Sequence, residues 1–520
     1  MTRCRRAVLA IAGVSLLAGC GWGGLDSSGA RSPVPEPTLT VPVGAEPASD
    51  PAYARFYGQT PGWRSCGSDA ECATVEVPVD WQDPGGATLD LALSRYPASG
   101  RRSGSLLLNF GGPGSSGADV VKQYGSGLTT ERVREHYDLV GFDPRGVGAS
   151  RGLDCVSDRE LDDYRAFDTS VDVEDDPARA LAEMRAMAAD FAAGCARDAG
   201  PLLAHLDTGS AARDMDVIRD ALGQERLDYL GYSYGTLLGA TFADELPQRV
   251  GRFVLDGALD PASSGTEVVA GQAAGIERAL TSYLQACLAG DVGDCPFEGT
   301  PEQALQEAAA VIAAADEAPL PTDGERDLTV GLAFTGVIAP LYDESSWPAL
   351  TTALTQAQAG NGTELLALAD GYSQRRDDGT YSSNIEEAFV AVNCLDYPVD
   401  DRPGAMDAAT RAIQRAAPVL GEYMAYGEVL CGEWPVPAVR TPAPVEAAGS
   451  PPILVIGTTG DPATPYIWAR ALAHQLESGV LLTYEGDGHT AYGRGSGCVD
   501  DVVDDFLVED AVAPDGTRCE

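Results

Sequence analysis

A serine between two glycines carries the strongest chemical signature in this sequence. Residues 227–236 read LDYLGYSYGT and contain the pattern G-x-S-x-G, with Ser233 at its centre. An apolar stretch precedes the pattern and a helix-forming stretch follows it, which is the strand–turn–helix setting of a nucleophile elbow. The sequence therefore predicts Ser233 as a nucleophile. A structural serine in a strand-to-helix turn is the alternative.

A serine nucleophile needs a base, and the chain has four histidines. His489 lies in a glycine-flanked loop after the last predicted strand, at the strand edge where the sites of parallel sheets gather. His136 begins a predicted strand, His205 lacks a strand-end context, and His474 lies within a helical stretch. We therefore predict that His489 is the base that deprotonates Ser233.

The acid that orients His489 is expected at the end of an earlier strand. Asp461 follows one predicted strand and is favoured, although an aspartate here can also cap the next helix. Asp256 ends the preceding strand and is the competing acid, whereas Asp487 is too close to His489 in sequence to orient it easily. The order Ser233, Asp461, His489 is that of α/β-hydrolases, and it differs from the chymotrypsin and subtilisin orders.

A glycine-rich loop supplies candidates for an oxyanion hole. Residues 111–117 read GGPGSSG and follow a predicted strand. The loop lacks the lysine of a phosphate-binding loop and the glycine spacing of a dinucleotide site. We predict that the backbone amides of Gly112 and Tyr234 stabilise the oxyanion, with Gly111 as the alternative to Gly112.

Eight short apolar stretches predict the sheet that positions these residues. The first two alternate in polarity, as antiparallel edge strands do, and the other six are nearly continuously apolar, as parallel strands buried on both faces are. With helices between them, they predict an α/β fold with a mostly parallel, doubly wound sheet of eight strands. The stretches are 73–79, 89–96, 105–110, 137–142, 227–232, 253–256, 453–457 and 480–484.

The strand series is interrupted between the sixth and seventh predicted strands. Residues 261–447 read mostly as helices, and the series resumes at 453. We therefore predict a core in two parts, 52–260 and 448–520, with residues 261–447 inserted as a helical lid over the carboxyl edge of the sheet. An appended domain without a role in the site is the alternative.

The first residues predict export. Residues 1–19 combine arginines with an apolar run too short to span a bilayer, as a signal peptide does. Residues 17–20, LAGC, resemble a bacterial lipobox, which predicts lipidation of Cys20; an ordinary secretory signal is the alternative. The proline-rich residues 20–51 predict a tether. We expect a protein that is anchored by lipid on the extracytoplasmic face of the membrane, or secreted.

Cysteine count and charge narrow the function further. Besides Cys4 and Cys20, ten cysteines remain, and their even number predicts disulfides in an oxidising compartment. Their spacing suggests that sequence neighbours pair, although connectivity does not follow from sequence. No metal-ligand spacing occurs, so we predict no metal and no cofactor. The net charge of −43 argues against a nucleic-acid partner.

Four motifs together resemble the prolyl-aminopeptidase type of α/β-hydrolase serine peptidases. They read FGGPGSSG (110–117), YDLVGFDPRGVGAS (137–150), GYSYGT (231–236) and DPATP (461–465). The most similar subgroup is that of the actinobacterial secreted tripeptidyl aminopeptidases and mycobacterial cell-envelope serine hydrolases. Residues 488–519 are similar to its TAP-like C-terminal region. The resemblance spans about residues 55–520, and it departs at Phe110, where many relatives carry histidine.

The resemblance implies release of tripeptides or single residues from peptides with a free N-terminus. Such an enzyme needs an anion to bind the substrate ammonium. The helical insertion offers Asp343, Glu344, Glu386, Glu387 and Asp396, each of which is more often a solvated or capping acid. The alternatives are a carboxylesterase or lipase with the same triad, and a non-catalytic surface lipoprotein of this fold.

Overall fold

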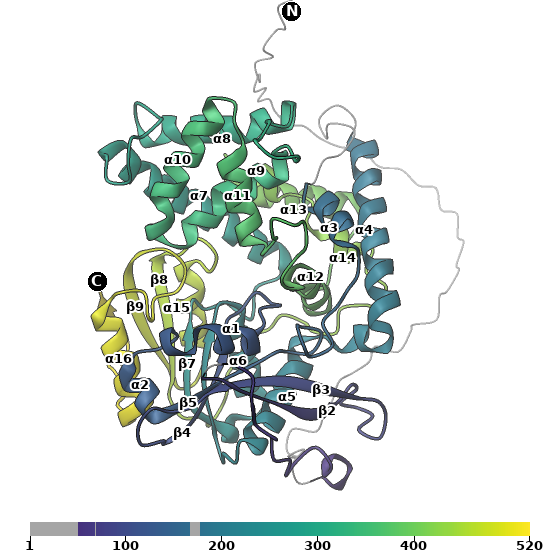
Figure 1. The fold of residues 1–520 in the computed structure, drawn as a ribbon, viewed down its shortest axis with the longest axis vertical. Coiled ribbons are helices and arrows are strands. Elements are labelled where there is room, and N and C mark those ends of the chain that lie inside the picture. Colours follow the sequence, from purple (N-terminus) through teal and green to yellow (C-terminus); the bar gives the residue numbers. More distant parts are fainter. Residues whose placement is uncertain (1–49, 68, 167–176) are drawn as a thin grey trace, which may run out of the picture. The chain divides into compact units, whose positions relative to one another are not determined.

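The computed structural model describes residues 50–67, 69–166 and 177–520 (Figure 1). Within these ranges ten strands form one sheet in the order β1-β2-β3-β5-β4-β6-β7-β8-β9-β10. The pairs β1–β2, β2–β3 and β3–β5 are antiparallel, and the other neighbours are parallel. The strands are β1 (Arg64–Ser65), β2 (Glu71–Pro78), β3 (Thr88–Tyr96), β4 (Gly104–Asn109), β5 (Tyr137–Phe142), β6 (Leu227–Tyr232), β7 (Val250–Asp256), β8 (Ile453–Gly460), β9 (Gly479–Asp487) and β10 (Thr517–Cys519).

The predicted mostly parallel α/β sheet is confirmed, but its strand number is corrected. The eight predicted stretches form β2 to β9, and the described sheet has ten strands because β1 and β10 extend its two edges. Strands of two and three residues are too short to show an alternating or continuous apolar pattern. β10 is held beside β9, with Thr517 opposite Leu482, and the disulfide Cys498–Cys519 ties it to helix α16.

Helices cover both faces of the sheet because successive strand residues point to opposite sides. On β4, Leu106 and Leu108 pack in the cluster that includes α1, α2 and α16, whereas Leu107 packs in the cluster that includes α5, α6 and α15. These helices are α1 (Gly117–Tyr124), α2 (Glu131–His136), α5 (Thr208–Ala221), α6 (Tyr234–Glu245), α15 (Tyr466–Gln475) and α16 (Gly497–Glu509).

The segment between β7 and β8 is helical. It has an apolar cluster of its own, which includes Leu280, Ile312 and Leu354. We call residues 261–447 the inserted segment. Its helices are α7 (Gly265–Ala289), α8 (Pro301–Glu317), α9 (Val330–Ile338), α10 (Trp347–Gln358), α11 (Thr363–Tyr372), α12 (Ile385–Asp396), α13 (Pro403–Ala416) and α14 (Glu428–Gly432).

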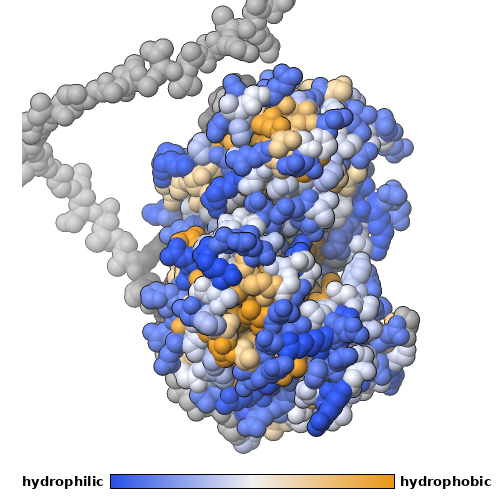
Figure 2. Space-filling view, turned by 90° about the vertical axis from the view of Figure 1, so that its left-hand side faces the viewer, coloured by the Kyte–Doolittle hydropathy of each residue, from blue (hydrophilic) through white to orange (hydrophobic). Residues whose placement is uncertain are grey.

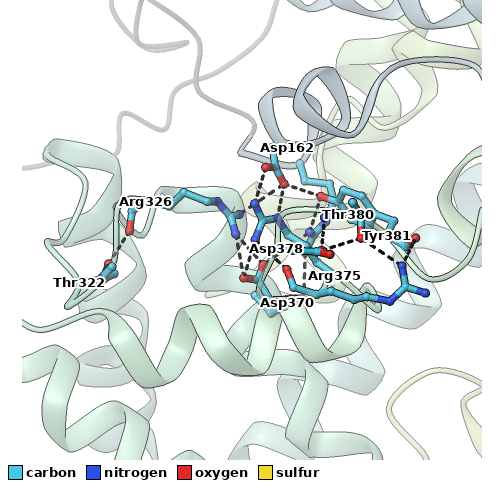
Figure 3. A network of polar contacts seen from close by, with 12 residues as sticks. Asp162, Thr322, Arg326, Asp370, Arg375, Asp378, Thr380 and Tyr381 are labelled. Carbon is cyan, nitrogen blue, oxygen red and sulfur yellow. Dashed lines mark hydrogen bonds and ion pairs between the residues drawn. The ribbon is translucent and has the colours of Figure 1, made fainter.

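A second helical excursion, between β5 and α5, was not predicted from the sequence. It contains α3 (Asp158–Ala166) and α4 (Pro177–Ala199), which pack against α9 and α14 of the inserted segment. Figure 3 shows the polar contacts that join the two: Asp162 of α3 accepts hydrogen bonds from Arg375 at 2.6 Å and from Tyr381 at 2.7 Å. Arg326 pairs with Asp370 of α11 at 2.8 Å in the same network.

Five disulfides join cysteines that are neighbours in sequence, which confirms the suggested pairing. They are Cys66–Cys72, Cys155–Cys195, Cys287–Cys295, Cys394–Cys431 and Cys498–Cys519. In the part of the chain that the structure describes, no helix has both the length and the apolar character needed to cross a bilayer. The predicted signal peptide and Cys20 lie outside the described residues. On the face shown in Figure 2, hydrophilic residues predominate and hydrophobic residues form separate areas.

A buried ion pair joins the loop after β5 to helix α5. Arg145 is 1 % exposed and donates to the Asp214 carboxylate at 2.7 and 2.8 Å. Its remaining N–H groups donate to the carbonyls of Pro78, Val79 and His205. Because every donor of the guanidinium is used, removal of Arg145 would leave both a charge and several carbonyls unsatisfied in the interior.

We expect Arg145→Met to lower the free energy of unfolding by about 3–5 kcal/mol, because it leaves Asp214 as an uncompensated buried charge. Arg151→Met is the matched control, since Arg151 pairs with Asp198 at 3.2 Å with a half-exposed side chain. Its effect should stay below about 1 kcal/mol. Urea unfolding of the disulfide-intact proteins measures both, and equal effects would contradict the prediction.

Candidate active site

Ser233 occupies a strained turn between β6 and α6. Its backbone angles are φ 54° and ψ −123°, a conformation that non-glycine residues rarely adopt. The turn is held on both sides: the Ser233 amide donates to the Asp256 carbonyl at 2.9 Å. The Ser233 carbonyl accepts from the Thr236 hydroxyl at 2.6 Å. The side chain is thus presented at the carboxyl edge of the parallel strands.

Three glycines leave room for this turn. A Cβ on Gly231 would lie 2.5 Å from the Gly235 carbonyl oxygen, and one on Gly235 would lie 2.8 Å from Asn109 Oδ1. A Cβ on Gly111 would lie 2.8 Å from the Cβ of Ser233 itself. The glycines of the G-x-S-x-G pattern and the first glycine of the 111–117 loop are therefore required by close packing around the serine.

His489 and Asp461 form a buried hydrogen-bonded pair. The His489 Nδ1 atom lies 2.9 and 3.0 Å from the two carboxylate oxygens of Asp461. The Asp461 carboxylate also accepts from the amides of Ala463 and Thr464, at 2.9 and 2.8 Å, and from the Thr464 hydroxyl at 3.0 Å. Asp461 therefore both orients the imidazole and caps the turn that follows it.

Asp256, the competing acid, contacts a different part of the same loop. Its carboxylate accepts from the amides of Ala491 and Tyr492 at 3.0 and 2.8 Å. Burial raises the pKa of Asp256 to about 6. The two carboxylates thus contact different groups of the same loop. Asp461 bonds the imidazole of His489, and Asp256 bonds the backbone amides after it.

The serine and the histidine flank the same two residues. The Asp256 carbonyl bonds the Ser233 amide, and a Cβ on the next residue, Gly257, would lie 3.2 Å from His489 Cε1. The structure therefore brings Ser233, Asp461 and His489 together at the ends of neighbouring strands. The other histidines lie elsewhere: His136 ends α2, His205 ends a 3-10 turn, and His474 lies in the last turn of α15.

The two candidate glycines of the oxyanion loop differ in one hydrogen bond. The Gly111 amide donates to Asn109 Oδ1 at 3.0 Å, so it is already used. Among the described residues, no protein acceptor lies in hydrogen-bond range of the amides of Gly112 and Tyr234. Asn109 is buried and was missed by the sequence analysis, although a polar residue that ends an apolar strand is a usable signal.

The inserted segment reaches both loops of the site. The Tyr342 carbonyl accepts from the His489 amide at 2.9 Å, and the two rings lie edge to face with centroids 5.2 Å apart. On the other side, a Cβ on Gly114 would lie 2.7 Å from the Ile385 carbonyl oxygen of α12. Tyr342 belongs to no sequence motif, so only its position in the fold identifies it.

The candidate acids of the inserted segment have different surroundings. Asp343 pairs with Arg494 at 3.0 Å, and Asp396 accepts from the Thr208 amide at 3.0 Å. Glu344 is exposed. Glu386 and Glu387 remain, in the first turn of α12.

The two glutamates of α12 are desolvated to different degrees. Glu387 is 5 % exposed, and one of its carboxylate oxygens has no hydrogen-bond partner. Burial raises its pKa to about 7. Burial also raises the pKa of Glu386, which lies near enough to Tyr372 to raise the pKa of that phenol. The Tyr372 hydroxyl donates to the Tyr342 hydroxyl at 3.2 Å.

Known proteins resemble this chain over most of its length. Residues 417–519 match a protein-family model described as "TAP-like protein". The chain is 38 % identical to the serine protease Hip1 of Mycobacterium tuberculosis, over 98 % of this chain and 96 % of that protein. The chain belongs to the α/β-hydrolase serine peptidases with a TAP-like C-terminal region. This confirms the family resemblance, and the protein is an enzyme of the serine hydrolase class.

Two further relatives of this serine peptidase family carry different names. A protein named carboxylesterase B from Mycobacterium tuberculosis is 38 % identical over 92 % of this chain and 95 % of its own length. A tripeptidyl aminopeptidase from Streptomyces lividans is 32 % identical over 86 % of this chain and 84 % of its own length.

We expect Glu387→Gln to stabilise the protein at alkaline pH. The folded-state pKa of about 7 lies above the usual value of 4.5, so ionisation of Glu387 costs folding stability as the pH rises through about 5 to 7. A neutral glutamine avoids this cost. The gain in unfolding free energy should be roughly 1–3 kcal/mol at pH 8 and should shrink towards zero below pH 5. Urea unfolding at both pH values measures this gain. A gain that does not depend on pH would contradict a raised pKa of Glu387 in the folded protein.

Proposed function

We propose that this serine hydrolase uses Ser233, His489 and Asp461 as a catalytic triad. The hydrogen bonds between His489 Nδ1 and the Asp461 carboxylate support this role, because they keep the proton on Nδ1 and leave Nε2 unprotonated. Nε2 then removes the proton from the Ser233 hydroxyl as its oxygen attacks the substrate carbonyl. The Asp461 carboxylate stabilises the imidazolium that forms.

The amides of Gly112 and Tyr234 then stabilise the negative oxygen of the tetrahedral intermediate. The engagement of the Gly111 amide with Asn109 favours Gly112 as the first donor. Collapse of the intermediate releases the leaving group, which takes the proton from His489, and an acyl-enzyme remains on Ser233. Water, deprotonated by His489, hydrolyses this ester by the reverse sequence of proton transfers.

Asp461→Asn should lower kcat roughly a thousand- to ten-thousand-fold, because it favours the wrong imidazole tautomer. Asp256→Asn should keep most of the activity and lose stability, since Asp256 bonds backbone amides after His489. The measurements are steady-state kinetics on a peptide anilide and thermal unfolding, with Ser233→Ala and a fluorophosphonate probe as the control for the nucleophile. The reverse ranking of the two aspartates would reassign the acid.

We further propose that the substrate is a peptide with a free N-terminus and that the inserted segment acts as a lid. Its contacts with His489 and with Gly114 support the lid role. A substrate ammonium needs an anion within the site, and we propose Glu386, which follows Ile385 in the first turn of α12, where the helix contacts Gly114. The tripeptidyl aminopeptidase among the relatives supports release of tripeptides. The relative named carboxylesterase B makes ester hydrolysis the second candidate.

Glu386→Gln should raise KM for an unblocked tripeptide anilide about 10- to 100-fold, because a charge-assisted hydrogen bond is lost. The KM for a simple ester should not change. Glu344→Gln is the matched control, since Glu344 is an exposed acid of the same segment. Wild-type protein that hydrolyses esters but neither unblocked nor N-acetylated anilides would overturn the aminopeptidase proposal in favour of the esterase.

We also propose that the enzyme is exported and held at the membrane by lipid on Cys20. Five disulfides support an oxidising compartment. A tether of about 30 residues can hold a folded domain tens of ångströms from the bilayer. The partner class is then peptides outside the cytoplasm, and the acidity of the chain argues against a nucleic-acid partner.

A further inference from the structure

Helix α12 contacts the glycine loop of the oxyanion hole with its first turns. A Cβ on Gly114 would lie 2.7 Å from the Ile385 carbonyl oxygen and 3.1 Å from the Ala388 Cβ. Gly114 is two residues beyond Gly112, whose amide we assign as one oxyanion donor. Since this contact leaves no space for even a methyl group, a displacement of α12 would be transmitted directly to the loop.

The other end of α12 reaches the second donor through one intermediary. Asp396, the last residue of the helix, accepts from both the amide and the hydroxyl of Thr208, which begins α5. The Thr208 hydroxyl oxygen lies 2.7 Å from the hydroxyl of Tyr234. A threonine hydroxyl has a single hydrogen. Because the Asp396 carboxylate takes that hydrogen, the Tyr234 hydroxyl must donate to Thr208.

The three residues form a chain of hydrogen bonds, in which the Tyr234 hydroxyl donates to Thr208 and the Thr208 hydroxyl donates to Asp396. All three residues are buried, and Asp396 is only 1 % exposed. Among the described residues, the hydrogen bonds that reach the Asp396 carboxylate come from Thr208 alone. A buried carboxylate is costly unless hydrogen bonds compensate it. Here the hydrogen bonds that compensate Asp396 come from Thr208, and the Thr208 hydroxyl also accepts from Tyr234, the residue after Ser233.

The end of α12 that carries Asp396 is fixed in turn. The disulfide Cys394–Cys431 links α12 to α14 two residues before Asp396, with a Cα–Cα distance of 4.9 Å. The carboxylate therefore sits at a covalently restrained point of the inserted segment. The hydrogen bonds through Thr208 connect this restrained point to the hydroxyl of Tyr234, the residue that follows Ser233.

We propose that Asp396 is a positioning residue that fixes the Tyr234 amide through Thr208, so that helix α12 sets both donors of the oxyanion hole. This inference rests on the proposed assignment of Gly112 and Tyr234 as those donors. It concerns the transition state of any acyl transfer at Ser233, so it holds whether the substrate is a peptide or an ester. Loss of the chain should lower kcat and leave KM nearly unchanged.

The test compares Asp396→Ala, Thr208→Val and Thr208→Ser with wild type. Complete loss of one oxyanion donor costs about 100- to 1,000-fold in kcat, and a displaced donor costs less. We expect kcat to fall about 10- to 100-fold in Asp396→Ala and Thr208→Val, with KM within about threefold. Thr208→Ser keeps the hydroxyl and should restore at least half of the wild-type kcat. Steady-state kinetics on an unblocked tripeptide anilide and on p-nitrophenyl acetate measure these values.

Glu277→Gln is the matched control for general loosening of the inserted segment. Glu277 lies on α7 and accepts from the amides of Val419 and Leu420, so it anchors the same segment away from Tyr234. Its kcat should stay near the wild-type value. An equal loss of kcat in Glu277→Gln would overturn the proposal, as would an unchanged kcat or a rise in KM alone in folded Thr208→Val.

Two further readouts keep the outcomes distinct. Thermal unfolding identifies variants that fail to fold, and if Asp396→Ala is one of them, the Thr208→Val and Thr208→Ser pair decides. Labelling of Ser233 by a fluorophosphonate tests the nucleophile separately, since its absence in folded wild type would contradict the proposed function. Labelled wild type whose variants react at the same rate and keep kcat would contradict only the role of Asp396.

Discussion

The strained backbone of Ser233 is the constraint on which the surrounding structure depends. A serine with φ of 54° between a strand and a helix persists only where its neighbours hold it. Three glycines pack against the turn, and a Cβ added to one of them, Gly111, would lie 2.8 Å from the Ser233 Cβ. The Asp256 carbonyl accepts from the Ser233 amide. The strand order places β4, β6 and β7 side by side, so the glycine loop after β4 lies next to the turn after β6.

Two buried carboxylates organise the histidine loop, and among the described residues neither forms an ion pair with an arginine or a lysine. Asp461 and Asp256 both lie in the interior, where an unpaired charge is costly, and both are surrounded by N–H donors. Asp461 bonds the His489 imidazole, whereas Asp256 bonds the following backbone. The loop is thereby held both at the His489 ring and at the main chain after it. A third hydrogen bond joins the His489 amide to the Tyr342 carbonyl of the inserted segment.

The polarity pattern along the sequence predicted the strands that are long enough to show one. The strands β2 to β9 were recognised because each is long enough to alternate or to be continuously apolar. The edge strands β1 and β10 are too short to show such a pattern, and the helices α3 and α4 were not predicted. The arginine–aspartate network that joins α3 to α11 also escaped prediction, since ion pairs between residues 162 and 375 leave no signature in either segment.

The sequence by itself determined the chemistry: a serine in an elbow motif, one histidine at a strand end, and a glycine loop after a buried strand. Only the tertiary structure shows that Asp461 contacts the ring of His489 whereas Asp256 contacts the backbone after it. It also shows that the Gly111 amide is hydrogen-bonded to Asn109, and what surrounds each acid of the inserted segment. The reason is that most of these contacts join residues far apart in the chain. Asp256 contacts an amide 235 residues away, and Asp396 contacts one 188 residues away. Residue type and spacing describe what a group can do, whereas its partner follows from the packing of the whole fold.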